Sequence, residues 1–388
     1  MPKVPLHSRN PLRVLLVSPL PPPSGGIGRW AVLALGWLKT KPEASVSLVD
    51  TAPRWRAVED LKLWKRAAGG VLQGLRDAWR TVVQFLVFRP HVLHLNTSAQ
   101  LRGPWDTGIL AVAALMRVPS IYHIHMGRLP EVMARNGGEW WGLRWALALA
   151  DRVVVLDQAS EQALKRFLPS QQVVRLPNAI APPPVANAHS EPEPPNVLYL
   201  GHVVPSKGMR ELMGAWRQLC PQGWRLRLAG LGSAAYRKEL LGIAGAEAQV
   251  EFLGDLSPEV AWRHMQAADI CVLPTYTEGF PNVILEAMAA GKAVISTRVG
   301  AIPEMLDADG EEPCGLVIAP RDVGALADGL RELMGNFRLR EALGRRAHAK
   351  VLRCYTTDVV FGQLLSLWRG VGGEGHNVGV QNLSPGTH

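Results

Sequence analysis

Cysteine is scarce in this sequence, and its four copies stand far apart, at positions 220, 271, 314 and 354. No two of them form a Cys-x-x-Cys pair, and no histidine lies beside any of them at metal-ligand spacing. This pattern excludes a disulfide scaffold and a metal site built on cysteine. Free cysteines are typical of a reducing compartment, so we expect a cytoplasmic protein.

Long apolar runs are also missing. No stretch approaches the roughly 18 to 20 uninterrupted apolar residues that a membrane-spanning helix needs. The short apolar run at residues 14–17 is followed at once by prolines at positions 19, 21, 22 and 23, which does not resemble the apolar core of a signal peptide. We therefore expect no export and no spanning segment, so that any membrane contact is peripheral.

Charge is unevenly distributed along the chain. Apolar residues make up 47% and charged residues 19% of the 388 positions, which is typical of a globular protein long enough for two domains. The net charge is +9, and residues 1–195 carry 23 Lys and Arg against 13 Asp and Glu. Such a basic half attracts anionic lipids or phosphorylated substrates. Because no nucleic-acid-binding motif accompanies the charge, we expect no nucleic-acid partner.

Short apolar segments bounded by turn residues alternate with segments of helical spacing. In the first half we expect strands at residues 13–18, 45–50, 91–96, 119–124, 152–156 and 172–176, and helices at 30–39, 61–88, 107–116, 140–150 and 160–167. In the second half we expect strands at 196–200, 224–228, 249–252, 270–273 and 293–296, and helices at 207–217, 235–243 and 258–265. This alternation is typical of doubly wound parallel α/β sheets.

A proline-rich stretch separates the two series of elements. Residues 181–196 read APPPVANAHSEPEPPN, a composition that cannot build a core and is typical of an extended linker. We therefore predict a Rossmann-like domain at residues 1–180 and a second one at 197–365. The tail at 370–388 is rich in Gly, Asn and Ser without periodicity, so we expect it to be disordered.

The most informative run is residues 277–300, TEGFPNVILEAMAAGKAVISTRVG. It predicts a loop, a helix and a buried strand. Pro281 suits the first helical position, so the backbone N–H groups of Asn282, Val283 and Ile284 should face whatever fills the loop. These donors and the helix dipole favour an anion such as phosphate.

Two glutamates frame that helix start. Glu278 lies in the loop and Glu286 in the first turns of the helix. A carboxylate accepts two hydrogen bonds from a vicinal diol, so one glutamate could hold a sugar and the other a ribose, with phosphate between them. The structural alternative is that Glu278 caps the helix and Glu286 is a solvated acid favoured by the dipole.

Two further segments of the second half combine a strand with glycine. In residues 198–208, LYLGHVVPSKG, Lys207 stands near a helix start, where a cation could meet a diphosphate. In residues 226–233, LRLAGLGS, Gly230 and Gly232 follow a strand and would let a ligand approach the backbone. A solvated lysine and a plain tight turn explain the same residues equally well.

The glycine segment at residues 24–29, SGGIGR, precedes a predicted helix and could present bare amides to a phosphate or a sugar. A nicotinamide oxidoreductase is an alternative here, because Gly26, Gly28 and Ala31 match G-x-G-x-x-A and Asp50 ends the next strand. Against it, seven residues with four prolines separate the first strand from Gly26, whereas that fingerprint needs a tight turn.

Two histidines close the predicted strand at 119–124. His125 stands at its C-terminal end, where ligands of doubly wound sheets bind. His123 lies two residues earlier and would share the same face, so either could be the functional residue. The alternative for each is a hydrogen-bonded structural histidine.

Residues 54–80 interleave Trp55, Trp64 and Trp79 with seven Lys and Arg and three acids. A basic helix with aromatic residues can lie at the interface of an anionic membrane. A buried helix pair with a solvated basic face is the alternative.

Taken together, these segments resemble the family 4 retaining glycosyltransferases of the GT-B fold, which include bacterial enzymes of lipopolysaccharide, exopolysaccharide and mannosyl-lipid assembly. The matching motifs occur in the family's order over residues 12–365. The resemblance implies two Rossmann-like domains facing a cleft. It also implies that a hexose-type sugar moves from a nucleotide sugar to a glycan or lipid-linked acceptor, without a metal or other cofactor, on the inner face of the plasma membrane or in the cytoplasm.

The resemblance also implies a role for individual residues. It makes His125 and Glu278 catalytic, beside the donor sugar. It assigns substrate binding to Gly25, Gly26, Gly28, His202, Lys207, Gly232, Leu253, Gly254, Glu278, Gly279, Phe280, Pro281, Asn282, Val283 and Glu286. His202 departs from the family, which usually has Arg there, so the diphosphate would depend more on Lys207. An inactive relative that still binds the nucleotide sugar is therefore a further alternative.

Overall fold

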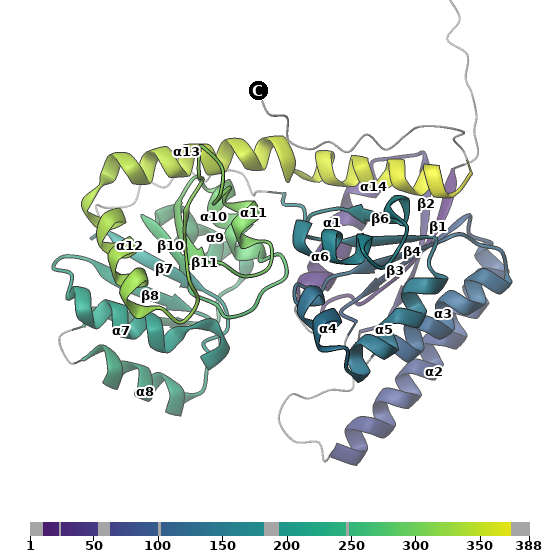
Figure 1. Ribbon diagram of the computed structural model, residues 1–388, viewed down its shortest axis with the longest axis horizontal. Coiled ribbons are helices and arrows are strands. Elements are labelled where there is room, and N and C mark those ends of the chain that lie inside the picture. Colours follow the sequence, from purple (N-terminus) through teal and green to yellow (C-terminus); the bar gives the residue numbers. More distant parts are fainter. Residues whose placement is uncertain are drawn as a thin grey trace, which may run out of the picture.

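A computed structural model describes residues 11–22, 25–52, 63–99, 102–181, 194–245 and 248–373. Within these ranges the chain forms two six-stranded sheets, each covered by helices (Figure 1). Every strand pairing in both sheets is parallel. The predicted fold class, two doubly wound α/β domains, is confirmed.

The first sheet has the strand order β2-β1-β3-β4-β5-β6. Its strands are β1 (Leu12–Ser18), β2 (Ala44–Asp50), β3 (Val92–Thr97), β4 (Ser120–Ile124), β5 (Arg152–Val155) and β6 (Val173–Arg175). The helices between them are α1 (Gly26–Leu38), α2 (Leu63–Phe88), α3 (Gly103–Leu115), α4 (Leu129–Arg135), α5 (Gly138–Leu149), α6 (Gln158–Lys165) and the 3₁₀ turn η2 (Ser170–Gln172). The chain reverses its direction across the sheet between β1 and β3, so their carboxyl ends form the point where ligands of such sheets bind.

The second sheet has the Rossmann order, β12-β11-β10-β7-β8-β9. Its strands are β7 (Asn196–Leu200), β8 (Arg225–Ala229), β9 (Val250–Gly254), β10 (Ile270–Leu273), β11 (Ala293–Thr297) and β12 (Leu316–Ile318). Its helices are the 3₁₀ turn η3 (Pro205–Lys207), α7 (Met209–Leu219), α8 (Ala234–Ala244), α9 (Pro258–Ala267), α10 (Asn282–Ala289), α11 (Ile302–Met305), α12 (Val323–Gly335) and α13 (Phe337–Cys354). Here the order reverses between β7 and β10, so the loops after these two strands lie at the edge where ligands of such sheets bind.

The last helix, α14 (Thr357–Val371), returns to the first domain (Figure 1). Its buried residues Phe361, Leu364 and Trp368 pack in one core with Leu16 and Trp30 of the first domain. The sequence-based division assigned residues through 365 to the second domain, and the tail was predicted to begin at 370. Both boundaries were wrong, because the apolar face of α14 is buried on the first sheet and the helix continues to Val371. Most of the linker, residues 182–193, and residues 374–388 of the tail lie outside the described residues.

Candidate functional site

The run 277–300 folds into a loop, helix α10 and strand β11, as the sequence predicted. Pro281 is the residue just before the helix and not its first member, with Asn282 at the first helical position. The amide of Ile284 donates to the carbonyl of Pro281 at 3.1 Å. It was predicted to be free, and that prediction was wrong. The amides of Asn282 and Val283 are the remaining backbone donors at this helix end.

Lys207 and Glu278 lie in direct contact as an ion pair, with 24% and 18% of their side chains exposed. Lys207 closes the turn η3 after β7, and Glu278 lies in the loop after β10, so the pair spans the point where the strand order reverses. Gly208 allows the turn that carries Lys207 to lie against the loop that carries Glu278. It has φ +70°, and a Cβ atom there would lie 1.9 Å from the carbonyl O of Pro274.

Glu286 forms an ion pair with Arg29 of the first domain. Its side chain is 16% exposed, and burial raises the pKa of its carboxyl while Arg29 acts in the opposite direction. Arg29 lies in the first turn of α1. Arg29 was not among the predicted site residues, although a cation directly after a glycine motif was the available signal.

The predicted glycine loop is largely the first turn of α1. The helix begins at Gly26, with Gly25 before it, so the expected start at residue 30 was wrong. A Cβ atom on Gly28 would lie 3.1 Å from Cδ of Pro21, and one on Gly26 would lie 3.9 Å from Nδ2 of Asn282. The N-termini of α1 and α10 therefore lie close to each other, one from each domain.

The glycines after β7 and β8 pack against one another. Gly201 and Gly230 have φ +151° and +138°, and a Cβ atom on Gly230 would lie 1.9 Å from the carbonyl O of Gly201. A Cβ atom on Gly232 would lie 2.8 Å from the carbonyl O of Val203. This close packing accounts for Gly230 and Gly232 without a ligand. His202, between these loops, is exposed, and its carbonyl accepts a 2.7 Å hydrogen bond from Tyr199.

The remaining second-domain candidates surround this edge. Leu253 and Gly254 end β9, and the carbonyl of Gly254 accepts a 2.7 Å hydrogen bond from the amide of Gly230. Gly279 packs against Gly127 of the first domain, where a Cβ atom on Gly127 would lie 2.0 Å from the Cα of Gly279. Phe280 is buried.

His125 belongs to a cluster of three histidines at the carboxyl edge of the first sheet. His94 and His123 are fully buried, and His125 is partly exposed. Nε2 of His94 lies 3.1 Å from Oδ1 of Asn96, and Nε2 of His125 lies 3.3 Å from the same atom. The rings of His123 and His125 have centroids 4.0 Å apart.

The histidines of this cluster are held neutral. Burial lowers the pKa of His94 to about 4 and, with His94 nearby, that of His125 to about 3, while His123 is lowered well below its usual value. Nε1 of Trp368 can only donate, so Nδ1 of His94 accepts its hydrogen bond and the His94 proton sits on Nε2. His125 is thus presented as a neutral imidazole, backed by a network that the sequence analysis did not foresee.

Two further polar links join the domains. Nδ2 of Asn178 donates to the carbonyl of Phe280 at 3.1 Å and to Oδ1 of Asn282 at 3.2 Å. The carboxylate of Glu304 accepts from Arg175 at 2.7 Å and from the amide of Gln158 at 2.8 Å. Burial raises the pKa of Glu304, and Arg175 acts against this rise. These contacts hold the loop before α10 and the helix α11 against the first domain.

The oxidoreductase alternative does not fit this geometry. Gly26, Gly28 and Ala31 lie within a helix and not in a strand-to-helix turn. Oδ1 of Asp50, which would bind the ribose, accepts hydrogen bonds from the amides of Leu20 at 3.0 Å and Ala52 at 2.9 Å. Among the described residues, no three His, Cys, Asp or Glu side chains are grouped to hold a metal ion. None of the helices described could cross a membrane, given their length and polarity.

Both halves of the chain match known protein families. Residues 31–182 match the family described as Glycosyltransferase Family 4, and residues 194–336 match Glycosyl transferases group 1. Sulfoquinovosyl transferase of Arabidopsis thaliana is 26% identical over 69% of this chain. Phosphatidyl-myo-inositol mannosyltransferase of Mycobacterium tuberculosis is 32% identical over 60% of this chain. The matches span 54% and 62% of those two proteins.

The fold is also found among solved structures. The Anabaena protein HepE, in complex with UDP, superposes with a TM-score of 0.67 and 18% sequence identity, covering 92% of this chain and 100% of that structure. At this identity the likeness concerns the fold alone.

Proposed function

This chain belongs to the family 4 glycosyltransferases, and we propose that it moves a hexose-type sugar from a nucleoside-diphosphate sugar to a hydroxyl group of its acceptor. The observation that carries the proposal is the meeting of Lys207, Glu278, Glu286 and two helix N-termini at one edge. The relatives named as sugar transferases from Arabidopsis and Mycobacterium support it.

In this proposal the diphosphate binds at the N-terminus of α10. The amides of Asn282 and Val283 and the ammonium of Lys207 take up the negative charge that develops as the leaving group departs. His202 adds a single hydrogen bond where the family usually has a guanidinium. The ribose diol is held by Glu286, and the base lies beside Leu253 and Gly254.

The sugar itself is placed between Glu278 and His125. Once the diphosphate attracts Lys207, the Glu278 carboxylate becomes available to the sugar hydroxyls. His125 is neutral at physiological pH, and because its Nε2 faces the acceptor Oδ1 of Asn96, its Nδ1 is left as an acceptor for the reacting region. The acceptor hydroxyl then attacks the anomeric carbon from the face that the leaving group vacates and gives its proton to the departing diphosphate, so the anomeric configuration is retained. No metal takes part, and an excess of EDTA is expected to leave the rate unchanged.

The decisive experiment is a screen of nucleotide sugars for slow hydrolysis by the purified chain, with the released nucleoside diphosphate identified by mass spectrometry. Release from at least one sugar nucleotide supports a transferase. Stabilisation against heat by UDP or GDP without any hydrolysis indicates the inactive relative. Stabilisation by a nicotinamide dinucleotide, with none by either diphosphate, contradicts the proposal in favour of the oxidoreductase.

For the acceptor we propose a glycan or lipid-linked hydroxyl reached from the cytoplasmic face of a membrane. Helix α2 supports this, because Leu72, Leu75 and Trp79 are 70%, 55% and 68% exposed and follow one helical face. Arg76 and Arg80 accompany them, which suits an anionic lipid surface. Trp55 and the Trp64 side chain lie outside the described residues.

Flotation with vesicles tests this contact. The chain is expected to float with phosphatidylglycerol vesicles and to be released from them by salt. The double variant Trp79→Ala and Leu75→Ala should bind these vesicles more weakly. Leu352→Ala, at a 54% exposed leucine of the second domain, is the matched control. Flotation that is the same for both variants would exclude α2 as the membrane contact.

A further inference from the structure

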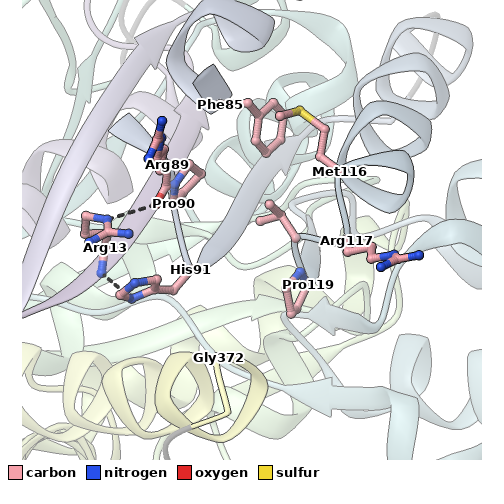
Figure 2. Close-up of a pocket in the computed structure, with 10 residues that line it drawn as sticks. Arg13, Phe85, Arg89, Pro90, His91, Met116, Arg117, Pro119 and Gly372 are labelled. Atoms are coloured by element: carbon pink, nitrogen blue, oxygen red, sulfur yellow. Dashed lines mark hydrogen bonds between the residues drawn. The ribbon is translucent and has the colours of Figure 1, made fainter. Parts of the chain in front are cut away.

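The two ends of the strands in the first sheet differ in how their polar side chains are arranged. At the amino ends lies a cavity of about 470 Å³, and its arginines Arg13, Arg89 and Arg117 point in different directions (Figure 2). They do not converge on one ligand. At the carboxyl ends, by contrast, the polar side chains around His94 and His125 are joined by hydrogen bonds.

A chain of hydrogen bonds at this carboxyl edge runs from α14 to His125. Nε1 of Trp368 lies 2.9 Å from Nδ1 of His94. Nε2 of His94 lies 3.1 Å from Oδ1 of Asn96, and the same oxygen lies 3.3 Å from Nε2 of His125. Asn96 is 3% exposed, so water has little access to its amide group.

The indole of α14 determines where the protons of this chain lie. An indole nitrogen can only donate, and burial lowers the pKa of His94, so the neutral ring accepts at Nδ1 and carries its proton on Nε2. This proton needs an acceptor, which makes the facing atom of the Asn96 amide its oxygen. The amide nitrogen of Asn96 then donates to Oγ of Ser18 at 3.0 Å, and Oγ of Ser18 donates to the carbonyl of Pro19 at 3.4 Å. Every bond in the chain therefore pairs one donor with one acceptor.

The amide oxygen of Asn96 also decides the state of His125. An oxygen of this kind can only accept, so Nε2 of His125 carries the proton and donates to it. Burial lowers the pKa of His125, so the ring is neutral and its Nδ1 is an acceptor. Among the described residues, Nδ1 of His125 has no partner and is not enclosed, whereas Nε2 of His123 is buried without a partner. A ligand can therefore reach Nδ1 of His125.

The backbone of His125 is held between the two domains. Its amide donates to the carbonyl of Thr97 at 2.9 Å, which fixes it against β3. Its carbonyl O would lie 3.6 Å from a Cβ atom on Gly279, in the loop of the second domain that also carries Glu278. The imidazole is thus presented at the edge where the sugar is placed in the proposed function.

We propose that Asn96 is a positioning residue that keeps the proton of His125 on Nε2, and that the Nδ1 left as an acceptor selects a sugar hydroxyl. The inference rests on the proposed function, because it takes the sugar of a nucleotide sugar as the ligand. A hydroxyl has a proton to donate to Nδ1. The carboxylate of a uronate has none, so two acceptors would face each other in the same place. The chain should therefore use a neutral sugar in preference to its uronate.

NMR of the imidazole nitrogens, in chain labelled at histidine, tests the role of Asn96 without any nucleotide sugar. Protonated and unprotonated ring nitrogens resonate in separate regions, and the variant His125→Gln identifies the signals of His125. Asn96→Leu removes the acceptor, so the His125 proton should be shared between both ring nitrogens. Asn196→Leu is the matched control, because Asn196 is 2% exposed but lies in the second domain, and it should leave these signals unchanged. A His125 proton on Nδ1 in the unmodified chain, or an unchanged His125 spectrum in Asn96→Leu, overturns the proposal.

Asn96→Asp keeps the shape and the acceptor, and it provides the test if the leucine variant does not fold. Its carboxylate would lie beside the imidazole, so His125 should become protonated at a higher pH than in the unmodified chain. The same NMR signals, followed against pH, measure this. A His125 titration that is equal in both chains would show that residue 96 does not contact the ring.

Hydrolysis of nucleotide sugars tests the selection itself. In the unmodified chain and in Asn196→Leu, kcat/KM for a neutral hexose donor should exceed that for its uronate by at least about tenfold, because an acceptor left unsatisfied is costly. In Asn96→Leu this ratio should fall by at least about threefold, since the ring can then donate from Nδ1. Equal kcat/KM for both sugars in the unmodified chain overturns the selection. If no nucleotide sugar is hydrolysed, the proposed function fails, whereas the NMR result for Asn96 stands.

Discussion

Nε1 of Trp368 donates a 2.9 Å hydrogen bond to Nδ1 of His94, joining residues 274 positions apart in the sequence. Trp368 lies in the last helix and His94 in β3 of the first sheet, and both are fully buried. Nε2 of His94 in turn lies 3.3 Å from Nδ1 of His123, whose ring is tilted by 31° to that of His125. The C-terminal helix thereby fixes which ring nitrogen of His94 carries the proton, in the network that also contains His123 and His125.

Trp368→Phe should destabilise the chain by about 1–3 kcal/mol, because the buried Nδ1 of His94 loses its donor. Urea unfolding followed by circular dichroism measures this change. Trp79→Phe, at a 68% exposed tryptophan, should stay within about 0.5 kcal/mol. Equal stabilities of Trp368→Phe and the unmodified chain would show that the hydrogen bond is dispensable.

The stability of the fold should depend on pH through His94, and His123 and His125 act in the same direction because burial lowers their pKa values too. The pKa of His94 is lowered from 6.5 to about 4, so the unfolded chain binds its proton first as the pH falls. The stabilisation from the neutral ring is therefore complete above pH 6.5 and is lost as the pH falls toward 4, by up to roughly 3 kcal/mol. Burial raises the pKa of Asp106 to about 6, which acts in the opposite direction between pH 6 and 3.8.

The variant His94→Gln separates the effect of His94 on stability from the opposite effect of Asp106. Unfolding free energies at pH 7 and 4.5 should differ less in this variant than in the unmodified chain. If both chains lose the same stability over that interval, His94 does not carry the pH dependence.

Gly127→Ala should lower catalytic turnover by about 100-fold, because the new methyl group would meet Gly279 and displace the loop that carries Glu278. Gly138→Ala is the control, since a Cβ atom there meets nothing within 4 Å. Steady-state hydrolysis of the nucleotide sugar measures both. Unchanged turnover in Gly127→Ala would mean that the domains need not approach this closely during the reaction.

Arg29→Gln should tighten the binding of a nucleoside diphosphate by up to about fivefold. Arg29 is half exposed, so its pair with Glu286 is worth roughly 0.2–1 kcal/mol, and removing it frees the carboxylate for the ribose. Glu286→Gln should weaken binding by at least about tenfold. Glu341→Gln, in an exposed pair with Arg345, serves as the control. Weaker binding in Arg29→Gln would instead place Arg29 against the ligand itself.

The strands and the helix α10 were predictable because buried parallel strands and their turn residues leave clear local patterns. Lys207 and Glu278 were predicted to line one substrate pocket, but their direct ion pair was not predicted. Strand β12 was not predicted, although β6, which is equally short, was. The return of α14 and the pairing of Arg29 with Glu286 depend on how distant segments pack, and no local pattern encodes that arrangement.

The route of α14 has a consequence for synthesis on the ribosome. The first domain's core includes Phe361, Leu364 and Trp368, so it stays incomplete until the last turns of the chain have left the exit tunnel. The second domain holds most of its own core residues and can fold earlier. The first domain is therefore made first but completed last, and a chain that stops before α14 would expose an apolar surface to chaperones and proteases.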